Sequence, residues 1–398
     1  MYPLSWLRID LSRLETNLAD WRGVLGHGSG SGRGATRICA VVKAGAYGLG
    51  ATQIARQLVA KGADMLAVYS VDQAEELFEL GISVPVLTLM PTRSLSTLLD
   101  VARQAANRGQ WHLSIHDPAE ITVVQKAAQR FGCRLPVHLY VDTGMSRGGL
   151  SAGQLAKLLQ ELPDQPGLKL AGVYTHFASA DADEGFVAEQ LHRLDFAMAE
   201  HLAQLPKDLL VHVASTFSAC RHSRYHRDMV RLGLGLFGYG PSMLAKSEVL
   251  PGLHHLAPTV RWTTRLVQVR RFSKNATVGY GRTHTLARES TLGLLPAGYG
   301  DGYPFVLGNR SVVQLGHNPD GRAITAPVIG HVNMDQLVVD LTDVGYARPG
   351  DPVDLISDDP TSPCSLERLA ELADTNCYEL LCRLSARLPR QYVGSDPT

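Results

Sequence analysis

Short apolar runs alternate with amphipathic segments over residues 37–240, and this alternation predicts repeated strand–helix units. A short, continuous apolar run is typical of a strand that is covered on both faces. Eight such runs follow one another: Ile38–Lys43, Asp64–Ser70, Val84–Met90, Trp111–His116, Pro136–Asp142, Leu168–His176, Leu209–Ser215 and Met229–Phe237. Eight successive β/α units predict a (β/α)8 TIM barrel.

The segments between the runs carry helix-start signals. Ser70 precedes Gln73 and Ser151 precedes Gln154 at the spacing of a capping box, in which the serine and glutamine side chains bond to each other's backbone amides. Before the first run, residues 12–25 place apolar side chains at helical spacing, so a helix is expected there.

After residue 241 the chain changes to alternating runs with few helical signals, which predicts a β-rich second domain. The expected strands are Val260–Val269, Thr291–Pro296, Ser311–Leu315, Ile324–Ile329, Gln336–Leu341 and Val353–Ile356. One amphipathic helix is expected from Ser365. We predict a barrel over residues 12–245 and a predominantly β domain over 246–398, with residues 1–11 joining the second domain.

Composition excludes several classes of partner. The 38 basic and 38 acidic residues balance, which argues against nucleic acid or an anionic membrane surface as the main partner. Neither a signal peptide nor a membrane-spanning stretch is evident. The six cysteines form no C-x-x-C pair and are typical of buried thiols in a reducing compartment. We therefore expect a cytoplasmic protein.

The barrel prediction also says where chemistry belongs, because active sites of TIM barrels lie at the carboxyl ends of the strands. The polar residues at those ends are Lys43, Asp142, Thr143, Arg147, His176, Ser215 and Arg231. Single residues of this kind are usually helix caps or surface groups. Seven of them on one rim predict a shared site.

Lys43 ends the first run and is followed by the small residues Ala44, Gly45 and Ala46, and Gly48 and Gly50 come soon after. Desolvation at a strand end lowers the pKa of a lysine, and such a lysine can form a Schiff base with an aldehyde. Gly45 and Gly48 would let the backbone lie close to a ligand. The alternative is a lysine whose ammonium group simply reaches the surface, and this stretch alone leaves both possibilities open.

Two other motifs carry weaker signals. Gly233–Gly238 fits the dinucleotide-binding pattern G-x-G-x-x-G, but it lies inside an apolar run and no helix is expected to open at its end. A strand end whose glycine amides meet a phosphate fits better. His222 and His226 have the spacing of metal ligands on a helix, but no second cluster completes a site, so no metal is expected.

Seven segments, in order along the chain, resemble the alanine racemase family, whose members use pyridoxal 5'-phosphate. They are Ala40–Gly48, Val141–Arg147, Tyr174–Phe177, Val278–Thr283, Gly298–Pro304, Asn333–Gln336 and Asn376–Glu379. The resemblance extends almost end to end, from Ile9 to Arg390. It implies an isomerase with the barrel and β-rich domain predicted above.

The resemblance also implies catalytic roles. Lys43 would hold the cofactor covalently and act as one proton-transfer base. Tyr280 of the partner subunit would act as the second base on the opposite face of the substrate, which implies a homodimer. Arg231 would meet the pyridine nitrogen and, because arginine keeps its proton at ordinary pH, would leave that nitrogen unprotonated.

Further residues would bind the cofactor and the substrate. The phosphate group would be held by Tyr47, Ser215, Gly233, Leu234 and Tyr378. His176 would pack near the ring, and Arg147 would support the phenolic oxygen. Arg147 and the backbone amide of Met334 would lie near the substrate carboxylate. Tyr299 would line the access passage.

Four positions depart from the common family pattern: Gly45, Leu49, Ala214 and Tyr140. Tyr140 stands where many members carry a lysine, often carbamylated, that braces the residue corresponding to Arg147. A hydroxyl hydrogen bond or a cation–π contact from Tyr140 could replace that brace. None of the four departures removes a proton-transfer group.

The interpretation is therefore a racemase that interconverts L-alanine and D-alanine and so feeds cell-wall precursor synthesis. The same chemistry on serine or another small amino acid is the nearest alternative. Two less favoured alternatives are a decarboxylase of the related barrel-plus-β type and a non-catalytic protein that binds the cofactor. The pair Lys43 and Tyr280 argues against both, because it serves to remove a proton and to return one to the substrate.

Overall fold

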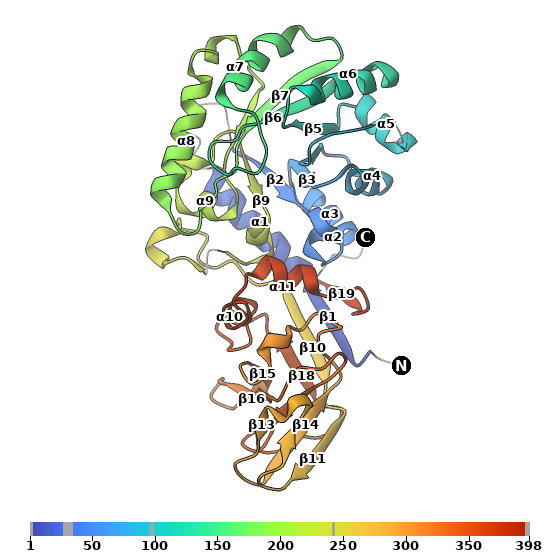
Figure 1. The fold of residues 1–398 in the computed structure, drawn as a ribbon, viewed down its shortest axis with the longest axis vertical. Helices are drawn as coiled ribbons and strands as arrows, with labels where there is room; N and C mark the ends of the chain where they lie inside the picture. The colour runs from blue at the N-terminus through green and yellow to red at the C-terminus, as the bar shows by residue number, and fades with distance from the viewer. Residues whose placement is uncertain (1–2, 27–34, 96–98, 241–242, 395–398) are drawn as a thin grey trace.

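A computed structural model of the chain describes residues 3–26, 35–95, 99–240 and 243–394. Two bodies follow one another along the long axis of the molecule (Figure 1). One is built on an eight-stranded sheet and the other on a nine-stranded sheet. The prediction of a TIM-like barrel with a C-terminal, mostly β domain is confirmed.

The eight-stranded sheet is parallel and nearly closed, in the order β8-β7-β6-β5-β4-β3-β2-β9. Its strands are β2 (Arg37–Val41), β3 (Met65–Val68), β4 (Val86–Thr88), β5 (Trp111–Ile115), β6 (Leu135–Tyr140), β7 (Leu168–Tyr174), β8 (Leu210–His212) and β9 (Met229–Leu232). Hydrogen bonds from Asp228 N to Val211 O (3.1 Å) and from Arg231 N to Ala214 O (3.0 Å) join the two end strands.

Every predicted barrel strand overlaps an observed one, but the last was predicted too long. The expected strand Met229–Phe237 ends at Leu232, because Gly233 leaves the extended conformation at φ −117° and ψ −98° and a short 3-10 helix, η4 (Leu234–Phe237), follows. The core strands are almost completely buried, which explains their continuous apolar sequence.

Helices surround the barrel sheet: α1 (Leu11–Gly26), α2 (Lys43–Tyr47), α3 (Ala51–Ala60), α4 (Val71–Glu79), α5 (Asp100–Asn107), α6 (Ala119–Phe131), α7 (Ala152–Glu161), α8 (Glu184–Ala199) and α9 (Thr216–Arg221). Short 3-10 turns are η1 (Leu162–Asp164), η2 (Leu202–Gln204) and η3 (Ser223–Tyr225). The Ser151 capping box is complete. Ser70 caps α4, but the side chain of Gln73 accepts from Tyr69 N instead of from Ser70 N.

The nine-stranded sheet has the order β11-β14-β17-β16-β15-β18-β10-β1-β19. Its strands are β1 (Ser5–Asp10), β10 (Val260–Arg265), β11 (Gln268–Phe272), β14 (Ser290–Leu295), β15 (Val312–His317), β16 (Ala323–Ile329), β17 (Leu337–Asp340), β18 (Pro352–Ile356) and β19 (Arg390–Val393). A hairpin of β12 (Thr277–Val278) and β13 (His284–Thr285) stands apart from this sheet.

The remaining elements of the second body are α10 (Leu366–Leu372), α11 (Cys377–Arg383), η6 (Lys246–Glu248), η7 (Tyr280–Arg282) and η8 (Phe305–Leu307). The helix predicted from Ser365 is confirmed as α10, with Ser365 as its N-cap. The single strand expected over Val260–Val269 is in fact two strands, because β10 pairs with β18 whereas β11 pairs with β14.

Strand β1 connects the two ends of the chain within one sheet. It pairs antiparallel with β10 and parallel with β19. Next to this junction the buried carboxylate of Asp358 accepts from Arg261 Nε at 2.8 Å and forms ion pairs with Arg13 at 3.1 Å and Arg8 at 3.5 Å. Three guanidinium groups from β1, α1 and β10 therefore converge on one carboxylate.

None of the helices within the described residues is long and apolar enough to cross a membrane. All six cysteines are free thiols.

We predict that Asp358→Asn lowers the free energy of unfolding by about 2–3 kcal/mol, because three arginines then lose a buried counter-charge. Urea unfolding measures the difference. Asp343→Asn is the matched control, since Asp343 is exposed and, among the described residues, forms an ion pair with Arg288 alone, so its cost is expected to be much smaller. Equal costs for the two variants would contradict the structural role of Asp358.

Candidate active site

The chain after β2 forms a left-handed turn. Ala44, Gly45, Ala46 and Tyr47 have φ values of 53°, 65°, 54° and 57°, and bonds such as Gly48 N to Ala44 O at 2.8 Å close the turn. A non-glycine residue in this region costs about 1 kcal/mol or more. A turn that stores such strain must be held by its surroundings.

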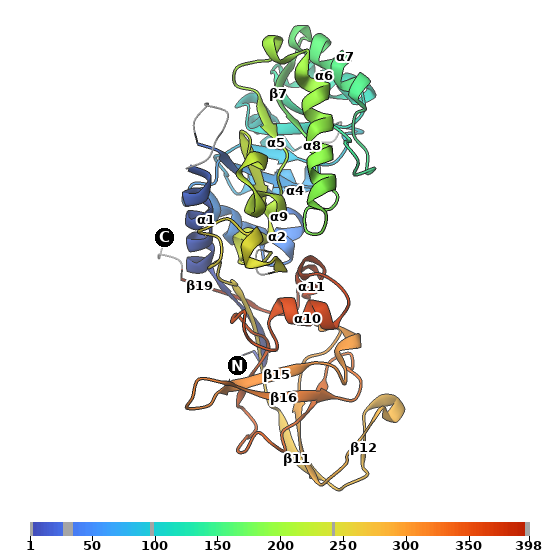
Figure 2. The same ribbon diagram turned by 90° about the vertical axis from the view of Figure 1, so that its left-hand side faces the viewer.

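The second body supplies that support. Arg390 Nη2 donates to Gly48 O at 2.8 Å, and a Cβ at Gly48 would lie only 2.8 Å from the backbone oxygen of Leu381 in α11. Figures 1 and 2 both show α2 beside α11. The turn that begins at Lys43 is thus clamped between the barrel and the second body.

Lys43 lies half-buried at the start of this turn. Burial lowers the pKa of its ammonium group, and the positive charges of Arg147 and Arg231 lower it further, whereas the Cys382 thiol opposes them. The proton of Lys43 is therefore held more weakly than that of an ordinary lysine. This property suits a group that must exchange protons or form a covalent bond to an aldehyde.

Arg231 is buried and is surrounded by neutral acceptors. Its Nη2 donates to Thr175 O at 2.7 Å and to His176 Nδ1 at 3.2 Å, and its Nη1 donates to His212 O at 2.8 Å and to His212 Nδ1 at 2.9 Å. Its guanidinium also lies 5.1 Å from the ring centroid of Tyr174. The Nε–H group takes no part in these bonds, so it remains as a donor for a ligand.

Three histidines inside the barrel continue the hydrogen bonds of Arg231. His212 Nε2 lies 2.9 Å from His138 Nδ1, and His138 Nε2 lies 2.8 Å from His112 Nδ1. A guanidinium can only donate, so each Nδ1 in this relay accepts and each Nε2 carries the proton. Room for His138 comes from Gly172, since a Cβ there would lie 2.2 Å from His138 Nδ1.

Burial keeps the relay neutral. It lowers the pKa of His112 to about 4, and it lowers the pKa of His138 and His212 well below the ordinary value. Burial and the charge of Arg231 also lower the pKa of His176, to about 3. The relay was missed from the sequence, although three histidines within predicted apolar strands are a usable signal for inward-facing polar groups.

A second corner of the site is lined by aromatic rings and backbone. The rings of Tyr47 and Tyr378 have centroids 5.4 Å apart, and a Cβ at Gly233 would lie 2.3 Å from the Tyr47 hydroxyl. Thr216, which the sequence did not single out, accepts from Gly233 N at 3.3 Å. Ser215 is the N-cap of α9 beside it. This corner, with backbone amides and tyrosine hydroxyls next to cations, fits a phosphate group.

The other predicted residues lie on the second body. Tyr299 and Met334 are brought together, because Tyr299 N donates to Asn333 O at 3.0 Å and Gly300 N donates to Met334 O at 2.9 Å. Arg387 joins these loops by bonds of 2.7 Å to Asp301 and to Asp335.

Tyr280 lies apart from Lys43. It belongs to η7, between β12 and β13, and its side chain is 77% exposed. Figure 2 shows the β12 arm projecting at the far end of the second body, away from α2. The base of the arm packs on a small apolar cluster of Val278, Leu286, Leu292 and Ile329.

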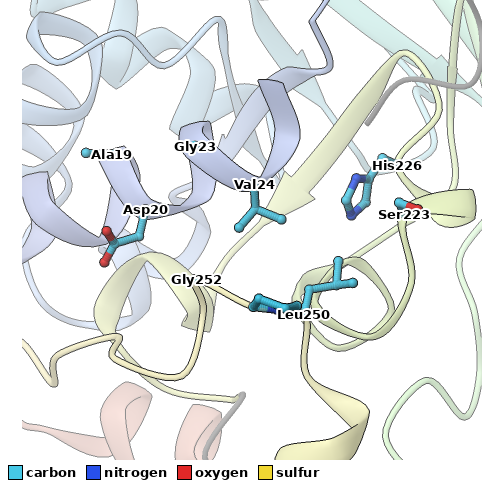
Figure 3. A pocket seen from close by; sticks show the side chains of 9 residues that line it. Ala19, Asp20, Gly23, Val24, Ser223, His226, Leu250 and Gly252 are labelled. Atoms are coloured by element: carbon cyan, nitrogen blue, oxygen red, sulfur yellow. The ribbon is translucent and has the colours of Figure 1, made fainter. Parts of the chain in front are cut away.

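A cavity of about 510 Å³ opens elsewhere, on the flank of the barrel (Figure 3). It is lined by Ala19, Asp20, Gly23, Val24, Ser223, His226, Leu250, Pro251 and Gly252. None of the predicted cofactor or substrate residues lines it. Within the described residues no group of three His, Cys, Asp or Glu side chains could hold a metal ion.

A barrel with a strained lysine turn, with buried or half-buried cations and with glycine backbone beside tyrosine hydroxyls at the carboxyl ends of its strands belongs to the class of TIM-barrel enzymes that bind phosphate-bearing ligands there. Comparison of the sequence with models of known protein families identifies one family within this class of enzymes. Residues 9–241 match the model of the alanine racemase N-terminal domain, and residues 259–392 match that of the C-terminal domain.

Individual relatives give the same result. The alanine racemase of Symbiobacterium thermophilum is 34% identical over 397 residues, covering 98% of this chain and 97% of the relative. Alanine racemase from D-cycloserine-producing Streptomyces lavendulae has a TM-score of 0.86 at 26% identity and covers 99% of this chain and 98% of that one. Alanine racemase from Bartonella henselae, with covalently bound pyridoxal phosphate, has a TM-score of 0.79 at 26% identity, covering 98% of this chain and 100% of that one.

The chain belongs to the alanine racemase family. The family is one of isomerases that depend on pyridoxal 5'-phosphate. The resemblance, the enzyme class and the cofactor expected from the sequence are thereby confirmed at the level of the family.

We predict that the free energy of unfolding falls as the pH is lowered from about 6.5 towards 4. In this interval the unfolded chain protonates its histidines near pH 6.5, whereas folded His112 stays neutral down to about pH 4. Each such histidine contributes up to about 1.4 kcal/mol per pH unit. Urea unfolding at several pH values measures this slope.

His112→Gln should make the slope shallower, because glutamine offers an amide oxygen to the relay without a titrating group. The same change at the exposed His192 is the control. An unchanged slope in His112→Gln would contradict the neutral relay.

Proposed function

We propose that this protein interconverts L-alanine and D-alanine with pyridoxal 5'-phosphate, and that Lys43 and Tyr280 of the partner subunit transfer protons on opposite faces of the substrate. The observation that carries the proposal is the setting of Lys43: a strained turn holds it half-buried, with its pKa lowered by burial and by two arginines. The family membership supports the reaction class.

The residues present fit the cofactor. Tyr47, Ser215, Gly233, Leu234 and Tyr378 would hold its phosphate, and the cradle around Gly233, which a Cβ would fill, supports this assignment. His176 would lie beside the ring, and Arg231 would donate to the ring nitrogen. When bound, pyridoxal phosphate supplies an electron-accepting ring that stabilises negative charge on the substrate α-carbon.

Racemisation needs two proton-transfer groups, because the proton leaves one face of the α-carbon and returns to the other. Lys43 Nζ would serve one face and the Tyr280 hydroxyl of the partner subunit the other. The exposed arm that carries Tyr280 stands away from the barrel of its own chain, which supports a homodimer with shared sites. We infer that each site is incomplete in a single chain.

Substrate binding falls to three residues. The Arg147 guanidinium and the Met334 backbone amide would hold the substrate carboxylate, and Tyr299 would line the access passage. Met334 and Tyr299 are 55% and 46% exposed, so both are available to a ligand or a second subunit.

We also propose a cytoplasmic location, supported by six free thiols, and a supply of D-alanine for cell-wall precursors.

The first experiment incubates the protein with pyridoxal phosphate and L-alanine in heavy water and follows loss of the α-proton signal by NMR. We expect the signal to decay and D-alanine to appear. Exchange with serine but not with alanine would contradict the alanine assignment while keeping the reaction class.

Shared sites predict complementation between two inactive variants. Lys43→Ala and Tyr280→Phe should each lower kcat at least about 100-fold, the usual contribution of a positioned acid or base. A heterodimer of the two, isolated through different tags, should regain about half of the wild-type kcat, because one of its two sites is then intact.

Tyr346→Phe is the control for loss of a surface hydroxyl, since Tyr346 is 83% exposed. A heterodimer no more active than its parent variants would show that Tyr280 is not shared between subunits.

A further inference from the structure

Two buried polar atoms at the ends of neighbouring barrel strands have no hydrogen-bond partner among the described residues: the Tyr140 hydroxyl and His116 Nδ1. Tyr140 ends β6, and His116 follows β5. Their ring centroids are 4.8 Å apart. Buried polar atoms without partners are costly, at about 1–3 kcal/mol each, so a neighbouring pair calls for a common explanation.

Both atoms are able to accept a hydrogen bond. His116 Nε2 lies 2.9 Å from Leu89 O, and because a carbonyl cannot donate, Nε2 carries the proton and Nδ1 offers a lone pair. Burial and the charge of Arg147 lower the pKa of His116, which keeps it in this neutral form. The phenol oxygen of Tyr140 is an acceptor of the same neutral kind.

The loop that carries Arg147 lies directly on these two rings. A Cβ at Gly148 would be 3.7 Å from His116 Nδ1, and a Cβ at Gly149 would be 3.1 Å from Cδ1 of Tyr140. Both glycines have positive φ, 80° and 111°, so the close approach depends on the absence of side chains.

Arg147, on the same loop as Gly148 and Gly149, is a source of hydrogen-bond donors for these acceptors. Its positive charge opposes the effect of burial on the pKa of Tyr140 and adds to the effect of burial on the pKa of His116. Arg147 is exposed and forms no ion pair with a residue that the structure describes. Five N–H donors without a carboxylate thus stand beside two unused acceptors.

We propose that Tyr140 and His116 form a neutral brace that holds Arg147 in its working position through hydrogen bonds to the Tyr140 hydroxyl and to His116 Nδ1. Both are positioning residues, and the inference rests on the proposed role of Arg147 in binding the cofactor and the substrate carboxylate.

A neutral brace has an electrostatic consequence. A carboxylate partner would offset the charge of Arg147, whereas two neutral acceptors leave it for an anionic ligand. The same charge lowers the pKa of Lys43. The ring of Tyr140 also lies against that of Tyr174, with centroids 4.8 Å apart and the planes tilted by 33°. The guanidinium of Arg231 lies 5.1 Å from the ring centroid of Tyr174.

A double-mutant cycle tests the brace through equilibrium titration of the cofactor-free protein with pyridoxal phosphate. Tyr140→Phe should weaken binding about tenfold, the cost of a hydrogen bond to a charged group. In an Arg147→Lys background the same substitution should cost less than about twofold, because lysine cannot make the paired contacts.

Steady-state kinetics gives a second measurement. KM for alanine should rise about tenfold in Tyr140→Phe, with kcat changed by less than about threefold, since the brace positions a binding group. Tyr225→Phe is the matched control: Tyr225 is fully buried in the same barrel and its hydroxyl accepts from Arg224. Neither its cofactor affinity nor its KM should change.

Equal effects of Tyr140→Phe in both backgrounds would overturn the brace. If Tyr140→Phe does not fold, His116→Gln replaces it in the cycle, with the same expected coupling to Arg147. If the wild-type protein binds pyridoxal phosphate but racemises no amino acid, the proposed function fails while the titration still decides on the brace.

Discussion

A buried guanidinium, that of Arg231, which has no carboxylate partner in the part of the chain that the structure describes, is the constraint on which the site depends. Arg231 is held by carbonyl oxygens and by neutral histidines, so its charge stays uncompensated inside the barrel. Burying an unpaired charge is costly, and the hydrogen-bonded histidines reduce that cost without cancelling the charge. The positive charge of Arg231 adds to the effect of burial in lowering the pKa of Lys43. The same charge favours the binding of anionic groups at the carboxyl ends of the strands.

The second constraint is mechanical. Residues 44–47 adopt a left-handed turn that their sequence, mostly non-glycine, does not favour. Contacts from α11 and Arg390 hold the turn in place. Strain at one domain is therefore balanced by packing from the other, and the position of the lysine depends on both.

The barrel could be predicted from the sequence because strands covered on both faces read as continuous apolar runs, and the rim residues followed from the fold. Local patterns do not show contacts between distant segments, so the clamp of α11 on α2 and the strand pairing of β1 with β19 could not be derived. The histidine relay was missed because bringing the three histidine side chains together depends on the register of four neighbouring strands, β5 to β8. The left-handed turn could not be predicted because Ala44, Ala46 and Tyr47 adopt positive φ values, which residues of these types rarely do.

The pairing of β1 with β19 places the first and last strands of the chain side by side. Topologically the barrel is therefore an insertion within the β-rich domain. During synthesis the barrel can complete its own sheet early, while its host sheet waits for the final strand to leave the ribosome. Arg390, which steadies the lysine turn, lies in that final strand. A chain cut short before residue 390 would contain every strand of the barrel but would lack the hydrogen bonds that Arg390 donates to Gly48 O in the lysine turn.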